Sequence, residues 1–380
     1  MPDVLIHGDT VRSPELRHEV PLAVPDPFLY VERDGRRILV VASLEVPRLE
    51  ELEAGLELRS PEHFGYDDLL AEGRDRDEAL VETYVRACRE LGVADAVVPA
   101  AFPLELADAL RAAGIPVSAD RKHFEHRRRA KNEAELAGIR RAQAAATAGI
   151  ARVAELLRAA DEDSGGALLL DGEPLTSELL RAEAEAVVAA HGAVPEDLIV
   201  SHGPQTSVGH ELGSGQLRAG EPIVLDFFPR DRESGCFGDM TRTFCVGEVP
   251  EELRRYHELC REALHRALAA IRPGVPGAEL HRLVCDLFHE HGFPTQLSKR
   301  PGETLADGFF HSLGHGVGLE VHEEPSLGRN GTELVAGDVV AVEPGLYRSG
   351  FGGCRLEDTV LVTEDGHENL TDHPYDLEIR

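Results

Sequence analysis

Three histidines and three glycines lie close together in residues 311–323. The histidines are His311, His315 and His322, and the glycines are Gly314, Gly316 and Gly318. Imidazole is the commonest neutral metal ligand and carries protons near neutral pH. Each glycine costs a helix roughly 1 kcal/mol relative to alanine, so we expect an extended or looping backbone here. The simpler alternative is a surface loop that is rich in histidine by chance, in a chain with 18 histidines.

Four acidic residues lie in or beside apolar, strand-like runs. Asp226 follows Ile-Val-Leu, Glu343 follows Val-Val-Ala-Val, and Asp239 and Glu357 lie next to similar runs. A lone ionised carboxylate in a buried strand costs several kcal/mol unless a cation or hydrogen bonds compensate it. Any one of them could face solvent or pair with an arginine. Together with the histidines they indicate a shared cation, because carboxylates and an imidazole suit divalent metals.

The order of these residues resembles a known metal-ligand set. Asp226, Asp239, His315, Glu343 and Glu357 follow the pattern of the Xaa-Pro peptidase and methionine aminopeptidase superfamily, which has the pita-bread fold. Residues 311–323 match the family's H-x-x-G-H-G-V-G-L-x-x-H-E signature at every fixed position. The two glutamate motifs match at Glu343-Pro344-Gly345-Leu346-Tyr347 and at Arg355-Leu356-Glu357-Asp358. The similarity covers about residues 130–380, with a weaker likeness to the creatinase/prolidase N-terminal domain before it.

The resemblance implies two divalent metal ions, with manganese favoured and cobalt or zinc as alternatives. Asp226 would bind one ion and His315 the other, and Asp239 and Glu357 would bridge the two. Glu343 would be a ligand and also the general base that takes a proton from the attacking water.

Further roles follow from the same resemblance. His210, His311 and His322 would line the substrate pocket and take part in catalysis, His322 by stabilising the oxyanion. Arg355, which would also contact substrate, is expected to orient the carboxylates together with Thr241 and Tyr347. The free amino terminus of the substrate would lie near Asp226.

The implied activity is hydrolysis of the peptide bond between an N-terminal residue and a following proline in a short peptide. A prolidase is favoured, and an arginine from the N-terminal domain that binds the dipeptide carboxylate would support it; the candidates are Arg36, Arg37 and Arg48. The alternatives are an aminopeptidase P that acts on longer peptides, a broader aminopeptidase or dipeptidase, and a pita-bread binding protein without catalysis.

Several departures from the family pattern bear on substrate preference. Phe228 stands where the family usually has glycine, and Gln205 and Gly209 stand for asparagine and proline near His210. Asp226 and Asp239 are thirteen residues apart, two more than in the family pattern. Because these positions border the pocket, they leave the strictness of the proline requirement open.

The surrounding elements predict two domains in an α+β fold. Strand-like runs at 28–32 and 38–42 flank Asp34-Gly35, which predicts a hairpin. Helical patterns at 76–91 and 104–113 alternate with strand-like runs at 95–99 and 115–118, which indicates a smaller α/β domain of creatinase/prolidase type at 1–125.

The pita-bread domain is expected at 126–380. Its predicted helices are 132–160, capped by Asn132, 176–190, 251–271 and 278–291. Its predicted strands are 197–201, 222–228, 241–246, 338–343 and 354–363.

The composition limits which partners and which cellular compartment are expected. Apolar residues make up 42% of the 380 residues and charged residues 28%, and the net charge of −30 disfavours nucleic acid and anionic membranes as partners. Residues 1–20 lack the apolar run of a signal peptide. The six cysteines form no C-x-x-C pair, so we expect reduced, buried thiols in a cytoplasmic protein. A homodimer is expected from the resemblance.

Overall fold

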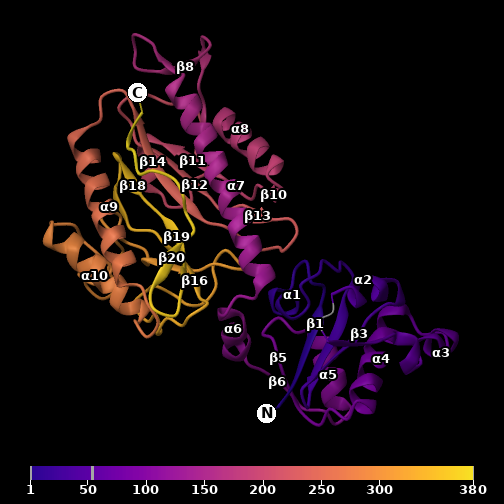
Figure 1. Ribbon diagram of the computed structural model, residues 1–380. Coiled ribbons are helices and arrows are strands. Elements are labelled where there is room, and N and C mark those ends of the chain that lie inside the picture. Colours follow the sequence, from indigo (N-terminus) through magenta and orange to yellow (C-terminus); the bar gives the residue numbers. More distant parts are fainter. Residues whose placement is uncertain (1, 53–54, 380) are drawn as a thin grey trace. The chain divides into compact units, whose positions relative to one another are not determined.

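The computed structural model describes residues 2–52 and 55–379 (Figure 1). The chain forms two compact units, Met1–Arg128 and Arg129–Arg380. They are called the N-terminal unit and the C-terminal unit below. No helix in the described part of the chain is both long enough and apolar enough to span a bilayer.

The N-terminal unit is built on a six-stranded mixed sheet. Its order is β4-β3-β2-β1-β5-β6, with β1, β2 and β3 antiparallel and the outer strands parallel to their neighbours. The strands are β1 (Asp3–Gly8), β2 (Phe28–Arg33), β3 (Arg36–Val40), β4 (Leu56–Arg59), β5 (Ala96–Val98) and β6 (Val117–Ala119). The helices are α1 (Pro14–Glu19), α2 (Val46–Glu50), α3 (Tyr66–Ala71), α4 (Arg76–Glu90), α5 (Leu104–Ala112) and α6 (Arg121–Arg129).

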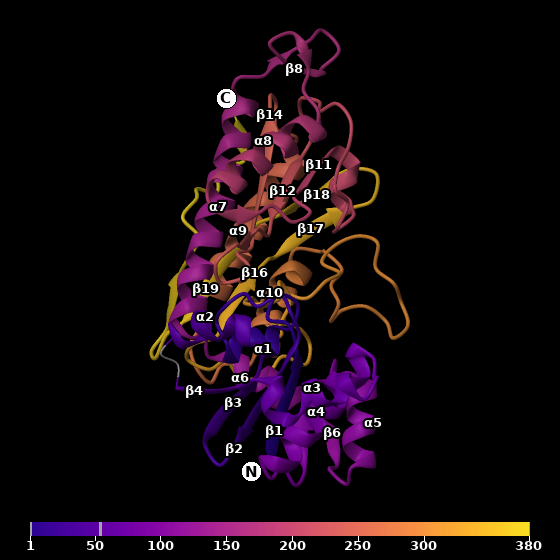
Figure 2. The ribbon, with the colours of Figure 1, turned by 90° about the vertical axis from the view of Figure 1, so that its right-hand side faces the viewer.

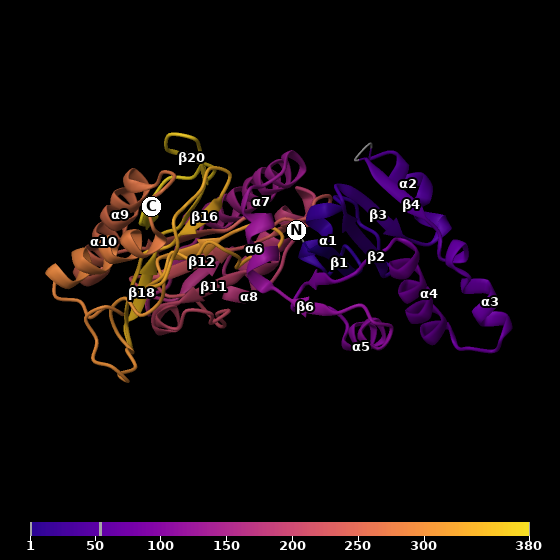
Figure 3. The same ribbon diagram turned by 90° about the horizontal axis from the view of Figure 1, so that it is seen from below.

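Each face of this sheet has its own core. Helices α4 and α5 pack on one face, where Leu29 and Val40 meet Tyr84 and Leu110. Helices α1 and α2 lie on the other side of the sheet (Figure 3). The predicted Asp34-Gly35 hairpin is confirmed, since β2 and β3 pair up to Arg33 and Arg36 and both turn residues have positive φ, at 51° and 76°.

The C-terminal unit contains two four-stranded sheets, each covered by a pair of helices (Figures 1 and 2). Helices α7 (Glu133–Arg158) and α8 (Ser177–Ala190) pack on the first sheet, whose order is β11-β12-β14-β21. Helices α9 (Glu251–Ala270) and α10 (Gly277–Glu290) share a core with the second sheet, β15-β16-β19-β20. The four long helices predicted for this unit are therefore confirmed.

The strands of the C-terminal unit belong either to one of the two four-stranded sheets or to smaller ladders. The first sheet consists of β11 (Ile199–His202), β12 (Ile223–Phe227), β14 (Met240–Val246) and β21 (Glu378–Ile379), and the second of β15 (Gly314–Gly316), β16 (Val339–Val342), β19 (Asp358–Val362) and β20 (His367–Asn369). Smaller ladders are formed by β7 (Asp161–Glu162), β8 (Leu168–Leu170) and β9 (Glu173–Pro174), by β10 (Ala193–Val194) and β13 (Arg230–Asp231), and by β17 (Gly345–Arg348) and β18 (Gly352–Arg355).

Helix α7 opens the C-terminal unit as the sequence predicts. The Asn132 side chain accepts a hydrogen bond from the Glu135 amide at 2.9 Å, and the Glu135 carboxylate accepts one from the Asn132 amide at 2.9 Å. This reciprocal capping box satisfies two backbone donors at the helix start. The buried face of α7 includes four alanines, which lets the helix lie close to the sheet.

One strand prediction is wrong. Residues 354–363 do not form a single strand, because β18 ends at Arg355 and β19 begins at Asp358. Strand β18 pairs with β17, whereas β19 pairs with β16 in a different sheet. The chain therefore changes sheets at Leu356 and Glu357, and Glu357 lies in an irregular break between two strands.

Candidate metal centre

Neighbouring strands bring the five predicted ligands to one place. Asp226 lies in β12, opposite Thr241 of β14, and Asp239 directly precedes β14. His315 is the middle residue of β15, which pairs with β16, and Glu343 follows β16. Glu357 precedes β19, on the other side of β16.

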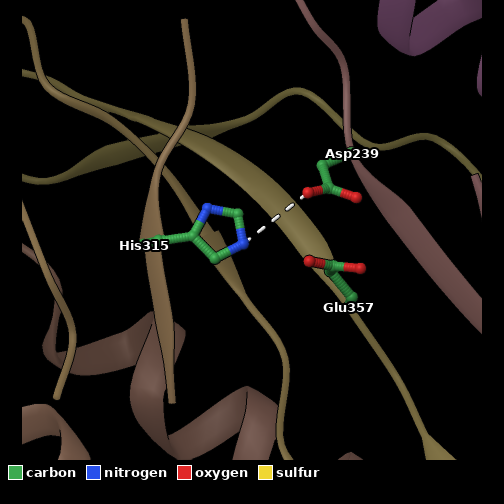
Figure 4. A group of neighbouring side chains, drawn as sticks. All are labelled: Asp239, His315 and Glu357. Atoms are coloured by element: carbon green, nitrogen blue, oxygen red, sulfur yellow. Dashed lines mark ion pairs between the residues drawn. The ribbon is translucent and has the colours of Figure 1, made fainter. Parts of the chain in front are cut away.

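All nine predicted site residues line one cavity of about 740 Å³. They are His210, Asp226, Asp239, His311, His315, His322, Glu343, Arg355 and Glu357. Three of them converge further: donor atoms of Asp239, His315 and Glu357 lie within 4.8 Å of one another (Figure 4). His315 Nε2 is 3.7 Å from Asp239 Oδ2 and 3.8 Å from Glu343 Oε1. We refer to the five predicted ligands as the candidate metal centre.

The carboxylates of this centre crowd negative charge in a buried place. Burial, together with the charges of Glu357, Asp226 and Glu343, raises the pKa of Asp239 well above its usual range. Burial and the charges of Glu343 and Asp226 do the same to the pKa of Glu357. Burial raises the pKa of Glu343 to about 7, although Arg355 opposes this. Such a site favours cations, and its oxygen and imidazole donors fit a divalent metal.

Arg355 supplies a guanidinium to these carboxylates. Its Nη2 donates to Asp226 Oδ2 at 2.5 Å, and its Nε donates to the Thr241 hydroxyl at 3.2 Å. Thr241 in turn donates its proton to Glu357 Oε2 at 2.6 Å. Arg355 thus orients the carboxylate of Asp226, and Thr241 orients that of Glu357.

A chain of hydrogen bonds sets the tautomer of His311. Arg355 Nη1 donates to the Tyr347 hydroxyl at 3.1 Å, and that hydroxyl donates to His311 Nε2 at 2.9 Å. His311 Nδ1 then carries the proton and donates to the Ser312 carbonyl at 2.8 Å. Burial lowers the pKa of His311 to about 3, so this ring is neutral.

The loop that carries His322 is closed by a short bridge and held by a buried ion pair. Gly316 and Glu323 exchange backbone hydrogen bonds at 2.9 and 3.0 Å. The Glu323 carboxylate pairs with Lys131, whose side chain is only 2% exposed. The ring of His322 lies against that of His315, with the centroids 4.2 Å apart.

Sequence reasoning missed the residues that hold Asp239 through its backbone. Gln143 Oε1 accepts from the Asp239 amide at 2.9 Å, and the Thr359 hydroxyl donates to the Asp239 carbonyl at 2.8 Å. Gln143 lies on α7, far away in sequence, and no local pattern distinguishes it from a surface glutamine. Phe228, which was noted as a departure, lines the cavity because alternation along β12 points Asp226 and Phe228 the same way, while Phe227 is buried in the core.

Two of the arginines considered for substrate binding have partners within the N-terminal unit. Arg36 makes two hydrogen bonds of 2.7 Å to Glu57, and Arg48 donates to Glu45 at 2.7 Å. Arg37 also interacts with other groups. The cysteines behave as expected, since all six are free thiols and all are buried.

Comparison with known proteins places this geometry in a family. The model of metallopeptidase family M24 matches residues 137–364. The Xaa-Pro dipeptidase of Pyrococcus furiosus is 36% identical over 177 residues, which are 46% of this chain and 47% of that protein. The probable dipeptidase PepE of Mycobacterium bovis is 33% identical over 287 residues, 74% of this chain and 68% of that protein. The chain thus spans about half the length of the first relative.

A solved structure extends the likeness to both units. The Xaa-Pro dipeptidase from Bacillus anthracis matches 100% of this chain and 95% of its own, with a TM-score of 0.80 at 23% identity. This match confirms the predicted fold, a pita-bread domain preceded by a smaller α/β domain. The family model covers more than half of the residues, and its span includes the whole candidate metal centre. The chain therefore belongs to metallopeptidase family M24.

Proposed function

We propose that this protein is a divalent-metal-dependent hydrolase that cleaves the bond between an N-terminal residue and a following proline in short peptides, as a prolidase does. The observation that carries the proposal is the convergence of four carboxylates and His315 in one cavity that His210, His311 and His322 also line. Metal ligands, a carboxylate that can act as a base and imidazoles beside them are parts with which a metal-dependent hydrolase cleaves an amide.

Two metal ions are proposed, held by Asp226, Asp239, His315, Glu343 and Glu357. Manganese is favoured because a set of four carboxylates and one imidazole suits a hard to borderline ion, with cobalt and zinc as alternatives. Bound there, such ions would supply Lewis-acid chemistry, which activates water and polarises a carbonyl. Metal analysis of the purified protein tests this; a protein without Mn, Co, Zn or Fe and without dependence on divalent ions would favour a pita-bread binding protein.

The side chains then have separate tasks. Glu343 is proposed to take the proton of the attacking water, and its Oε2 lies 3.9 Å from His311 Nδ1 at the edge of the cavity. His322 would donate a hydrogen bond to the oxyanion as its charge develops. His210 and His311 would hold the peptide, and Arg355 would keep Asp226 in place for the amino terminus of the substrate. The leaving nitrogen takes up a proton as the C–N bond breaks; proline nitrogen, which has no N–H in the peptide, thereby becomes a secondary amine.

A substitution of Glu343 tests the assignment of the base. Glu343→Gln keeps the volume of the side chain and removes its basicity, so turnover should fall by about 10²–10⁴-fold while the fold is kept. Glu364→Gln, an exposed change in the same unit, should retain wild-type activity. Near-normal turnover of Glu343→Gln, with circular dichroism unchanged, would show that another group is the base.

The size of the substrate separates three related activities. The name of the P. furiosus relative supports a dipeptidase for Xaa-Pro, whereas the name of the PepE relative supports a dipeptidase without a stated proline requirement. Hydrolysis of Ala-Pro, Ala-Pro-Ala and Ala-Ala-Ala with added manganese distinguishes the candidates. Cleavage of Ala-Pro alone indicates a prolidase, preference for Ala-Pro-Ala an aminopeptidase P, and cleavage of Ala-Ala-Ala a broader aminopeptidase.

Location and assembly are also part of the proposal. Six free, buried thiols support a cytoplasmic protein, because oxidising compartments favour disulfides. A homodimer is proposed from the family resemblance, and light scattering on the purified protein tests it.

A further inference from the structure

The break between β18 and β19 raises the question of what holds Glu357. No strand pairing in the described residues includes Glu357, because the ladders of β18 and β19 end on either side of it. Its amide donates to the Thr241 carbonyl at 3.1 Å. Its own carbonyl accepts from Arg242 Nη1 at 2.8 Å. A metal ligand at an irregular position thus depends on a single arginine for one of its two backbone bonds.

Arg242 uses every one of its N–H groups. Arginine has five such donors in a fixed plane. Its Nη1 donates to the carbonyls of Thr241 at 3.0 Å and Glu357 at 2.8 Å. Its Nη2 donates to Asp358 Oδ1 at 3.0 Å and to the His373 carbonyl at 2.8 Å, and its Nε to the Pro374 carbonyl at 3.0 Å. The side chain is only 1% exposed, so water does not substitute for these acceptors.

Arg242 contacts Glu357 from outside the cavity. Alternation along β14 puts the side chains of Thr241 and Thr243 on one side and that of Arg242 on the other. The Thr241 hydroxyl reaches the Glu357 carboxylate, whereas Arg242 reaches the Glu357 backbone and does not belong to the cavity lining. The carboxylate and the main chain of the same ligand are therefore held by neighbouring residues of one strand.

The same guanidinium also binds the segment 373–378. Besides the carbonyls of His373 and Pro374, Arg242 contacts Tyr375, whose ring centroid lies 4.4 Å from its Cζ. The Tyr375 hydroxyl bonds to Asp358, which also accepts from Asn369 Nδ2 at 2.6 Å. This segment continues into β21, which pairs with β14. Arg242 thus links residues 373–375, which lead into the last strand, to a ligand of the candidate metal centre.

We propose that Arg242 is a positioning residue for metal binding: it holds the backbone of Glu357 so that the carboxylate faces Asp239 and His315, and it joins this ligand to the segment 373–378. The inference rests on the metal site of the proposed function but not on the peptidase activity. A lysine at this position would keep the charge beside Asp358, yet its three donors radiate from one nitrogen and cannot reach acceptors in five directions.

Metal titration of the purified full chain tests the proposal. The chain is freed of metal with a chelator and titrated calorimetrically with Mn²⁺ in three variants. Arg242→Lys should weaken binding of at least one equivalent by tenfold or more. Tyr375→Phe removes a neighbouring hydroxyl but leaves all five Arg242 bonds, so it should bind within twofold of wild type. Val153→Ala, a change in the α7 core, controls for a general loss of stability.

Hydrogen exchange supplies a readout that needs no variant. In the wild-type chain, addition of Mn²⁺ should slow exchange of the amides in 373–378, because ordering Glu357 orders its partners through Arg242. Arg242→Lys should abolish this protection if it folds. The proposal is overturned if Mn²⁺ leaves the exchange of 373–378 unchanged in the wild type, or if a folded Arg242→Lys variant binds Mn²⁺ as tightly as wild type. Neither result bears on which peptides are cleaved.

Discussion

Replacing Lys131 by methionine should destabilise the C-terminal unit by about 3–5 kcal/mol, because it removes one partner of a buried ion pair. The side chains of Lys131 and Glu323 are 2% and 3% exposed. Without the lysine, the buried Glu323 carboxylate loses the ammonium group that lies against it. The 316–323 loop also carries His322, so we expect turnover to fall together with stability.

The predicted loss of stability depends on the cost of removing a charge from water, and not only on the attraction between Lys131 and Glu323. Taking a charge out of water costs several kcal/mol, and the partner charge offsets this cost only while both are present. Removal of both charges in Lys131→Met with Glu323→Gln should therefore cost at least 2 kcal/mol less than the sum of the single changes. For a unit of this size, 3–5 kcal/mol corresponds to a decrease in Tm of about 6–20 °C.

A double-mutant cycle by urea unfolding measures this coupling. The control is Arg140→Met on α7, which begins just after Lys131. The ion pair of Arg140 with Glu368 is exposed on both sides (45% and 46%) and should contribute at most about 1 kcal/mol. If the effects of the two single changes add within about 0.5 kcal/mol in the double variant, the pair is not coupled and the reasoning is wrong.

Two further predictions concern single buried groups. Thr241→Val keeps the shape but removes the hydroxyl that bonds to Glu357, and should cost about 1–3 kcal/mol in urea unfolding; a loss below 0.5 kcal/mol would contradict this. Burial lowers the pKa of His281 to about 4 from 6.5, so the unfolded chain takes up the proton first as pH falls. Well above pH 6.5, His281 is neutral in both the folded and the unfolded chain, and its shift does not reduce the free energy of unfolding. As the pH falls to 5, protonation of the unfolded chain lowers the free energy of unfolding by up to about 2 kcal/mol. His281→Leu should flatten the loss between pH 7.5 and pH 5, and an unchanged slope would refute it.

The parts of the fold that local patterns encode were predictable. The Asp34-Gly35 turn needs positive φ at two successive residues, and Asn132 with Glu135 caps a helix within a single turn. Strands β12 and β16 were also visible, because short apolar runs lead up to Asp226 and Glu343. Each of these signals depends on residues within a few positions of one another.

Other features depend on partners far away along the chain. The run from Cys354 to Val362 is uniformly strand-like, and only the choice of partners, β17 for one half and β16 for the other, breaks it at Glu357. Gln143 binds Asp239, which is 96 residues later, and Arg242 binds the carbonyl of Glu357, 115 residues later. Strand β1 also escaped notice, since Val4, Leu5 and Ile6 lie between polar residues near the terminus.

Within the candidate metal centre, the balance of charge at Asp226 differs from that at Asp239 and Glu357. Arg355 donates directly to Asp226, so that carboxylate already has a cation at 2.5 Å. Among the described residues, Asp239 and Glu357 receive no such contact, and burial together with the neighbouring carboxylates raises the pKa of each. The unmet demand for positive charge is therefore greatest where these two carboxylates meet His315, the three groups that lie within 4.8 Å of one another. A divalent cation gains most on that side, whereas one beside Asp226 must compete with Arg355.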